Sequence, residues 1–207
     1  MLTIGIAGGT ASGKTVLVEA LQQHFAAESI AIVPQDTYYK DNSHLPLVER
    51  QAINFDHPDS IDFDLLTQHV KQLQEGKTIQ VPEYSYKTCT RTGQFTAVAS
   101  KPILIVEGIL LFTQTKLCAL LDMKVFIDVD ADERLMRCVH RDGKQRNRTM
   151  EQVFDRYQKT VKPMYDELIA PSKKKADIII VGGGKNTAGL RLLQAVIEQE
   201  LRRNSKS

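Results

Sequence analysis

Short apolar runs recur along the chain and are separated by longer stretches of mixed character. Five of them are rich in β-branched residues and end at polar or turn-forming positions: Leu2 to Ala7, Ile30 to Pro34, Ile103 to Val106, Val125 to Val129 and Ile178 to Val181. Runs of this length and composition predict strands that are buried on both faces, which is typical of parallel sheets.

Apolar residues with helical spacing lie between several of these runs. One predicted helical face contains Phe63, Leu66, Val70 and Leu73, and a second contains Met150, Val153, Tyr157, Val161, Met164 and Leu168. Strands that alternate with helices indicate an α/β fold, with a five-stranded parallel sheet and helices on both sides. A length of 207 residues favours a single domain.

Two stretches interrupt this alternation. Residues 78–98 are β-prone, are punctuated by Pro82 and Gly93, and show no helical spacing, which predicts a β-hairpin insertion. Residues 137–150 include a basic stretch that Gly143 and Asn147 interrupt, which predicts a mobile segment between two helices.

Composition and charge narrow the possible functions. The net charge of +2 predicts no broad basic surface, so we expect no nucleic-acid partner. No apolar run approaches the roughly 20 residues of a membrane helix, and the N-terminus lacks a signal-peptide pattern. Cys89, Cys118 and Cys138 have neither disulfide nor zinc-site spacing. We therefore expect a cytoplasmic protein with reduced thiols and no membrane partner.

The segment after the first predicted strand has the pattern G-x-x-x-x-G-K-[ST]. It consists of Gly8, Gly9, Thr10, Ala11, Ser12, Gly13, Lys14 and Thr15. The backbone amides of such a loop, together with the start of the following helix, bind phosphate groups. The lysine then reaches the β- and γ-phosphates and the hydroxyl ligates magnesium, so the pattern predicts a site for ATP with Mg²⁺.

Two carboxylates are expected at the same edge of the sheet. Glu107 ends the third apolar run and is predicted to hold magnesium with Thr15, although a solvated acid at a strand end is an alternative. Asp36 follows the second run, where it can accept the proton of an attacking hydroxyl or act as a turn cap. The first reading of Asp36 favours a small-molecule kinase, and the N-K-x-D signature of GTPases is missing.

Several further motifs follow the phosphate loop in order along the chain: Gln35 to Tyr39, Asn54 to Asp59, Pro82 to Tyr86, Glu107 to Leu110 and Gly183 to Asn186. Together with the loop they make the chain resemble the uridine kinase (uridine/cytidine kinase) family over nearly its whole length. The resemblance implies a kinase-type P-loop fold and transfer of the γ-phosphate of ATP to the 5'-hydroxyl of a pyrimidine ribonucleoside. It also implies a homo-oligomer.

The same resemblance implies roles for individual residues. Asp36 becomes the general base and Asp56 binds the ribose hydroxyls, while the remaining acceptor-site residues are Tyr38, Phe55, Tyr84 and Tyr86. Three arginines of a lid over residues 137–150 close on the ATP phosphates and join Lys14 in stabilising charge: Arg141, Arg146 and Arg148. Without the resemblance, the tyrosines could equally pack on the core and the arginines could form a solvated face, and we expect such a face for Arg137.

Three positions depart from the family's usual pattern. Cys89 replaces a base-reading histidine, Cys138 replaces the second of two arginines, and Arg156 replaces a glutamine. We expect Cys89 and Arg156 to line the acceptor site. An arginine donates but cannot accept hydrogen bonds, which favours uridine over cytidine or a different polyol. A phosphoribulokinase-like kinase of another small alcohol or sugar, and a non-catalytic P-loop module that senses nucleotide, remain the alternatives.

Overall fold

A computed structural model describes residues 1–145 and 148–204 of the chain. Five parallel strands form one sheet in the order β2-β5-β1-β6-β7: β1 (Leu2–Gly8), β2 (Ile30–Pro34), β5 (Ile103–Gly108), β6 (Met123–Asp128) and β7 (Ile178–Val181). The five predicted strands and the α/β fold class are thus confirmed. The apolar runs form strands here because β1 and β5 lie inside the sheet and are covered on both faces.

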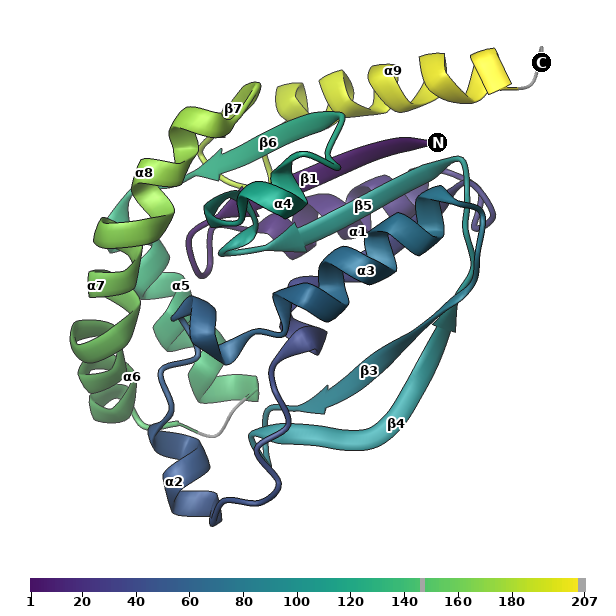
Figure 1. The fold of residues 1–207 in the computed structure, drawn as a ribbon. Coiled ribbons are helices and arrows are strands. Elements are labelled where there is room, and N and C mark those ends of the chain that lie inside the picture. Colours follow the sequence, from purple (N-terminus) through teal and green to yellow (C-terminus); the bar gives the residue numbers. More distant parts are fainter. Residues whose placement is uncertain (146–147, 205–207) are drawn as a thin grey trace.

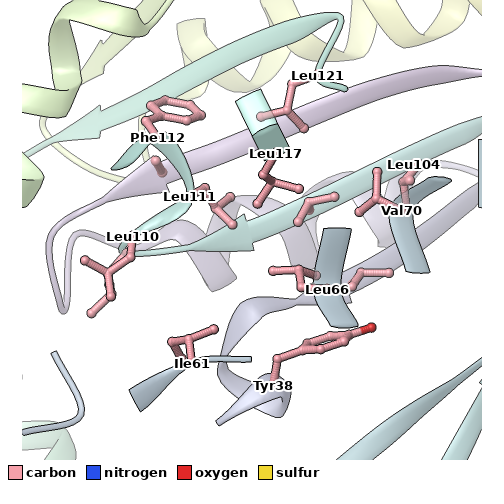
Figure 2. Close-up of a cluster of buried hydrophobic side chains, with 14 of the residues drawn as sticks. Tyr38, Ile61, Leu66, Val70, Leu104, Leu110, Leu111, Phe112, Leu117 and Leu121 are labelled. Carbon is pink, nitrogen blue, oxygen red and sulfur yellow. The ribbon is translucent and has the colours of Figure 1, made fainter. Parts of the chain in front are cut away.

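Helices cover the two faces of this sheet (Figure 1). On one face pack α1 (Lys14–His24) and α9 (Thr187–Asn204), which contribute Leu21 and Ile197 to a shared core. On the other face lie α3 (Phe63–Gln74) and α4 (Thr115–Cys118), together with the short helical turn η3 (Leu111–Thr113). Figure 2 shows the second core, where side chains of α3, α4 and η3 meet those of β5.

A long helical segment follows residue 149. It consists of α6 (Met150–Arg156), η4 (Tyr157–Val161), α7 (Lys162–Met164), η5 (Tyr165–Ile169) and α8 (Ala170–Ser172). The predicted helix is confirmed, but its buried face differs, because η4 and η5 are wider π-helical turns that shift the spacing of inward positions. Val153, Val161 and Ile169 are buried, whereas Met150 is 59% exposed.

The predicted hairpin is confirmed as a separate antiparallel pair. Its strands are β3 (Ile79–Ser85) and β4 (Thr90–Val98), joined by a turn in which Cys89 adopts a φ of +52°. Figure 1 shows the hairpin standing apart from the five-stranded sheet, with α3 between them. The remaining short helices are η1 (Gln35–Tyr38), α2 (Leu47–Ala52), η2 (Pro58–Ser60) and η6 (Lys173–Lys175).

The predicted break between two helices is shorter than expected, because helix covers most of residues 137–145, while the mobility of this stretch stays a prediction. Helix α5 (Ala131–Gln145) runs through this stretch without interruption at Gly143. A glycine inside a helix costs only about 1 kcal/mol relative to alanine, and on either side of Gly143 the helix buries Cys138 and pairs Asp142 with Arg141 and Arg148. Arg146 and Asn147 lie outside the described residues. Across the described parts of the chain, no helix is both long and apolar enough to cross a membrane.

Candidate active site

A cavity of about 670 Å³ lies where β1, β2 and β5 end. Because β5 lies between β1 and β2 in the sheet, the segments that follow these three strands converge at one edge. Lys14, Asp36 and Glu107 line the cavity from these three positions. Tyr84 of the hairpin and Arg156 of α6 complete the opposite walls.

The phosphate loop turns sharply from β1 into α1. Gly13 has a φ of +93°, and a Cβ atom there would lie 2.8 Å from the backbone nitrogen of Gly184, so glycine is required. The Lys14 ammonium donates hydrogen bonds to the carbonyl oxygens of Gly8 and Gly9, at 3.0 and 3.1 Å. Burial lowers the pKa of Lys14, and the nearby carboxylates of Glu107 and Asp36 oppose this shift.

Most residues of the phosphate loop line the cavity. Thr10, Ala11, Gly13, Lys14 and Thr15 line it directly. Gly8, Gly9 and Ser12 do not line it; the first two hold the lysine through their carbonyl groups, and Ser12 is fully buried. The loop therefore has the open amides and the single cation of a phosphate-binding nest at a helix N-terminus.

Thr15 and Glu107 lie together, as expected of two groups that hold one metal ion. The Thr15 hydroxyl lies 3.2 and 3.3 Å from the two carboxylate oxygens of Glu107. Burial raises the pKa of Glu107, and the Lys14 ammonium partly counters this effect. A desolvated carboxylate beside a hydroxyl is a hard oxygen site that fits Mg²⁺.

A magnesium ion in this position would need further ligands. In residues 1–145 and 148–204, no group of three or more His, Cys, Asp or Glu side chains could hold a metal alone. Magnesium commonly keeps several water ligands and is bound by one or two protein groups plus substrate phosphates. The pair of Thr15 and Glu107 therefore suits an ion that arrives with a nucleotide.

Asp36 is positioned by two elements. It lies in η1, immediately after β2, and the Tyr86 hydroxyl of the hairpin donates a hydrogen bond of 2.9 Å to its Oδ2 atom. This contact fixes the orientation of the carboxylate toward the cavity. A carboxylate held in this way, near the phosphate loop, can accept a proton from a hydroxyl group that is bound beside it.

Aromatic rings form the wall next to Asp36. The ring centroid of Tyr39 lies 5.1 Å from that of Phe55 and 4.9 Å from that of Tyr84. The ring centroids of Tyr84 and Tyr86 are 5.4 Å apart. Cys89 lines the same wall. Flat apolar faces beside a carboxylate suit a ligand that combines a planar ring with hydroxyl groups.

The structure does not bring Tyr38 into this wall. Its side chain is fully buried among the apolar residues of the second core (Figure 2). Its hydroxyl lies 2.8 Å from His69 Nδ1. The next residue, Tyr39, is extended, forms a β-bridge with Ile61 and lines the cavity instead. Tyr38 ends the 3-10 turn η1, whereas Tyr39 continues in extended backbone, so the two side chains leave the chain in different directions and, of the two, Tyr39 lines the site. The signal in the sequence was His69, a polar residue on the apolar face of α3 that needs a buried partner.

Asp56 is the third cavity carboxylate, after Asp36 and Glu107, and it is 2% exposed. Its Oδ1 atom accepts a hydrogen bond of 3.2 Å from the Thr10 hydroxyl, which links it to the phosphate loop. Its Oδ2 atom accepts one of 2.8 Å from Arg156 Nη2, although the two residues are 100 positions apart. Nearby carboxylates hold the pKa of Arg156 above its ordinary value in spite of its burial. The residue that departs from the family pattern therefore contacts the carboxylate expected to bind ribose.

Basic residues of α5 and of the segment after it form the remaining wall. Arg141 and Arg148 line the cavity, while Arg146 lies outside the described residues. Arg137 also lines it, and its side chain stays 39% exposed beside Glu133, which agrees with the expected solvated face. Helix α5 places this turn beside the glycines after β7, where a Cβ atom on Gly183 would meet the guanidinium. Lys185 lines the cavity as well and was missed, although the motif from Gly183 to Asn186 contains it.

Comparisons with known proteins agree with this geometry. Residues 3–188 match the model of the phosphoribulokinase / uridine kinase family. The chain is 45% identical over 204 residues to a uridine kinase of Bacillus cereus (strain AH187), an alignment that covers 97% of this chain and 96% of that protein.

Solved structures share the fold at low sequence identity. Phosphoribulokinase from Rhodobacter spheroides superposes with a TM-score of 0.64 at 18% identity, over 87% of this chain and 69% of that one. D-glycerate 3-kinase from Cryptococcus neoformans var. grubii superposes with a TM-score of 0.62 at 17% identity, over 89% and 87% of the two chains. The family match covers the phosphate loop, the three cavity carboxylates and the arginine wall, and the chain is therefore an ATP-dependent small-molecule kinase of the phosphoribulokinase / uridine kinase family.

Proposed function

We propose that the protein transfers the γ-phosphate of ATP to the 5'-hydroxyl of a pyrimidine ribonucleoside, with uridine as the preferred acceptor. The observation that carries this proposal is the joining of two half-sites in one cavity. The phosphate loop and Glu107 form the donor half, and Asp36, Asp56 and the aromatic wall form the acceptor half. The acceptor half offers one carboxylate for proton removal, a second for a ribose diol, and flat rings for a base.

Each group of residues in the site has a role in the proposed reaction. Asp36 accepts the proton of the 5'-hydroxyl while the oxygen attacks the γ-phosphorus, and the bond from that phosphorus to the β,γ-bridging oxygen breaks to release ADP. Lys14 and the two described lid arginines stabilise the negative charge that spreads over the phosphoryl oxygens. Asp56, which accepts a hydrogen bond from Thr10, holds the ribose so that the 5'-hydroxyl faces Asp36.

Magnesium belongs to the proposed reaction as the partner of ATP. Thr15 and Glu107 would hold it, since their oxygen atoms lie together at the start of α1. When bound, the ion neutralises phosphate charge that the protein's own cations do not reach.

Uridine is favoured over cytidine by the chemistry of Arg156. Its guanidinium lines the cavity and can donate to the carbonyl oxygens of uracil, but it cannot accept a hydrogen bond from the amino group of cytosine. A buried donor without a partner costs about 1–3 kcal/mol, enough for roughly 5- to 150-fold selectivity. The name of the Bacillus cereus relative, uridine kinase, supports the same choice.

The proposal is tested by measuring ATP consumption with a panel of acceptors. Uridine should give the highest kcat/KM, followed by cytidine, with 5'-deoxyuridine inactive because it lacks the accepting hydroxyl. Turnover of a sugar or an organic acid, but of no nucleoside, would instead assign the basic wall to a different acceptor. Absence of turnover with every acceptor, combined with tight ATP binding, would indicate a nucleotide sensor.

A further inference from the structure

A second buried carboxylate, which takes no part in the proposed reaction, holds arginines from three parts of the chain. Asp142 on α5 is 1% exposed. Its Oδ1 atom accepts a hydrogen bond of 2.8 Å from Arg141 Nε, and its Oδ2 atom accepts one of 3.0 Å from Arg148 Nη1. Arg156 Nη1 lies 3.5 Å from the same Oδ2 atom. We refer to Asp142 and these three arginines as the Asp142 cluster.

The cluster contains more positive charge than its carboxylate neutralises. Three guanidinium groups lie within ion-pair distance of Asp142, and all three line the cavity. Arg141 Nη2 is buried and lies 2.8 Å from Oδ1, yet it makes no well-aligned hydrogen bond within the described parts of the chain. Arg141 and Arg148 are therefore poised to move toward an anion that enters the cavity, because phosphate oxygens offer them better partners.

Arg156 is shared between the Asp142 cluster and the acceptor half of the site. It lies 2.8 Å from Asp56 and 3.5 Å from Asp142, so its stronger contact is with Asp56. A carboxylate has about four acceptor positions, and Thr10 and Arg156 already use two of those of Asp56. Weakening the contact with Arg156 would make more of Asp56 available to the hydroxyl groups of an acceptor.

We propose that Asp142 and Arg156 are positioning residues that couple the binding of the two substrates, an inference that rests on the proposed function. Nucleotide phosphates draw Arg141 and Arg148 away from Asp142. Asp142 then attracts Arg156 more strongly, since it has lost two of its cationic partners, and Arg156 loosens its hold on Asp56. ATP binding thereby strengthens acceptor binding, and by linkage the acceptor strengthens ATP binding by the same factor.

The test is the ratio of the dissociation constants of a non-hydrolysable ATP analogue without and with saturating uridine, measured by calorimetry with magnesium present. In the wild type this ratio should be at least about fivefold. Asp142→Asn and Arg156→Gln should each bring it to within about twofold of unity, whatever they do to the separate affinities. If Asp142 and Arg156 had a purely structural role, their substitution would change the stability of the protein and its affinity for each substrate. The ratio of the analogue's dissociation constants without and with uridine would stay at the wild-type value.

Asp155→Asn provides the matched control. Asp155 neighbours Arg156 in α6 and forms an exposed ion pair of 2.7 Å with Lys159. The ratio should remain at the wild-type value in this variant. If Asp142→Asn does not fold, as judged by its thermal transition, Arg156→Gln decides alone, since it removes the opposite end of the same contact.

Two results would overturn the inference: a wild-type ratio near unity, or a wild-type ratio that persists in Arg156→Gln. Neither result affects the proposed function, which the acceptor panel decides separately. If that panel identifies another alcohol in place of uridine, the proposed function fails, and the same ratio measured with that alcohol decides whether the coupling exists.

Discussion

The donor half and the acceptor half of the cavity are built in different ways. The donor half consists of eight consecutive residues and one strand-end carboxylate, and much of its chemistry belongs to backbone amides. The acceptor half takes side chains from η1, the loop after α2, the hairpin and α6, and its residues meet only in the folded chain. The donor half therefore tolerates little change, whereas the acceptor half can be altered one side chain at a time.

The positions that differ from the family pattern follow this division. Cys89 and Arg156 line the acceptor half, and Cys138 is buried in the helix that carries Arg141. The phosphate loop, by contrast, matches its pattern in full. Substitutions in the donor half should thus affect every acceptor equally, while those in the acceptor half should change the choice of acceptor.

Lys14→Ala should have the largest effect and abolish transfer to every acceptor. The ammonium is the one loop cation that can neutralise charge near the leaving group, so kcat/KM should fall by at least about 10³-fold. Steady-state kinetics with two acceptors would check this. Lys159→Ala, in an exposed ion pair, should behave like the wild type. Activity of Lys14→Ala within a few-fold of the wild type would contradict the role of the loop.

Asp36→Asn should have the next largest effect, because the amide keeps the shape of the side chain but cannot take up a proton. We expect kcat to fall by about 10²- to 10⁴-fold with little change in nucleotide affinity. Tyr86→Phe removes only the hydrogen bond that orients Asp36 and should reduce kcat far less. A loss of ATP affinity without a loss of kcat would instead place Asp36 in the donor half.

Glu107→Gln should change the requirement for magnesium. The amide keeps a single weak ligand oxygen and loses the negative charge, so the magnesium concentration for half-maximal activity should rise by about 10- to 100-fold. A titration with magnesium at saturating ATP and acceptor measures this shift. An unchanged titration would show that Glu107 does not hold the metal ion.

Tyr38→Phe should have the smallest effect and should act on stability alone. It removes the hydrogen bond to His69, which we expect to lower the free energy of unfolding by about 1 kcal/mol, with kcat/KM within about twofold of the wild type. Denaturant unfolding and kinetics check the two parts. Tyr39→Phe should do the reverse and raise the KM of the acceptor, because Tyr39 lines the cavity.

The sheet and the donor half could be predicted from the order of residues along the chain. Five β-branched apolar runs identified the strands, and the loop pattern placed Lys14 and Thr15 at the start of a helix. These features could be predicted because short-range spacing controls them: an apolar run needs burial on both faces, and a glycine-rich turn needs consecutive residues. The position of Glu107 near the end of β5 could be predicted for the same reason, because this residue directly follows an apolar run.

The arrangement of the acceptor half could not be predicted in this way, because it depends on contacts between distant parts of the chain. Nothing in the local sequence distinguishes Tyr38 from Tyr39, whose burial depends on contacts with α3 and Ile61. The contact of Arg156 with Asp56 joins residues 100 positions apart, and the burial of Asp142 depends on how α5 and α6 pack. Such contacts depend on the relative placement of whole elements, which the packing of both cores sets and which no pattern within one segment records.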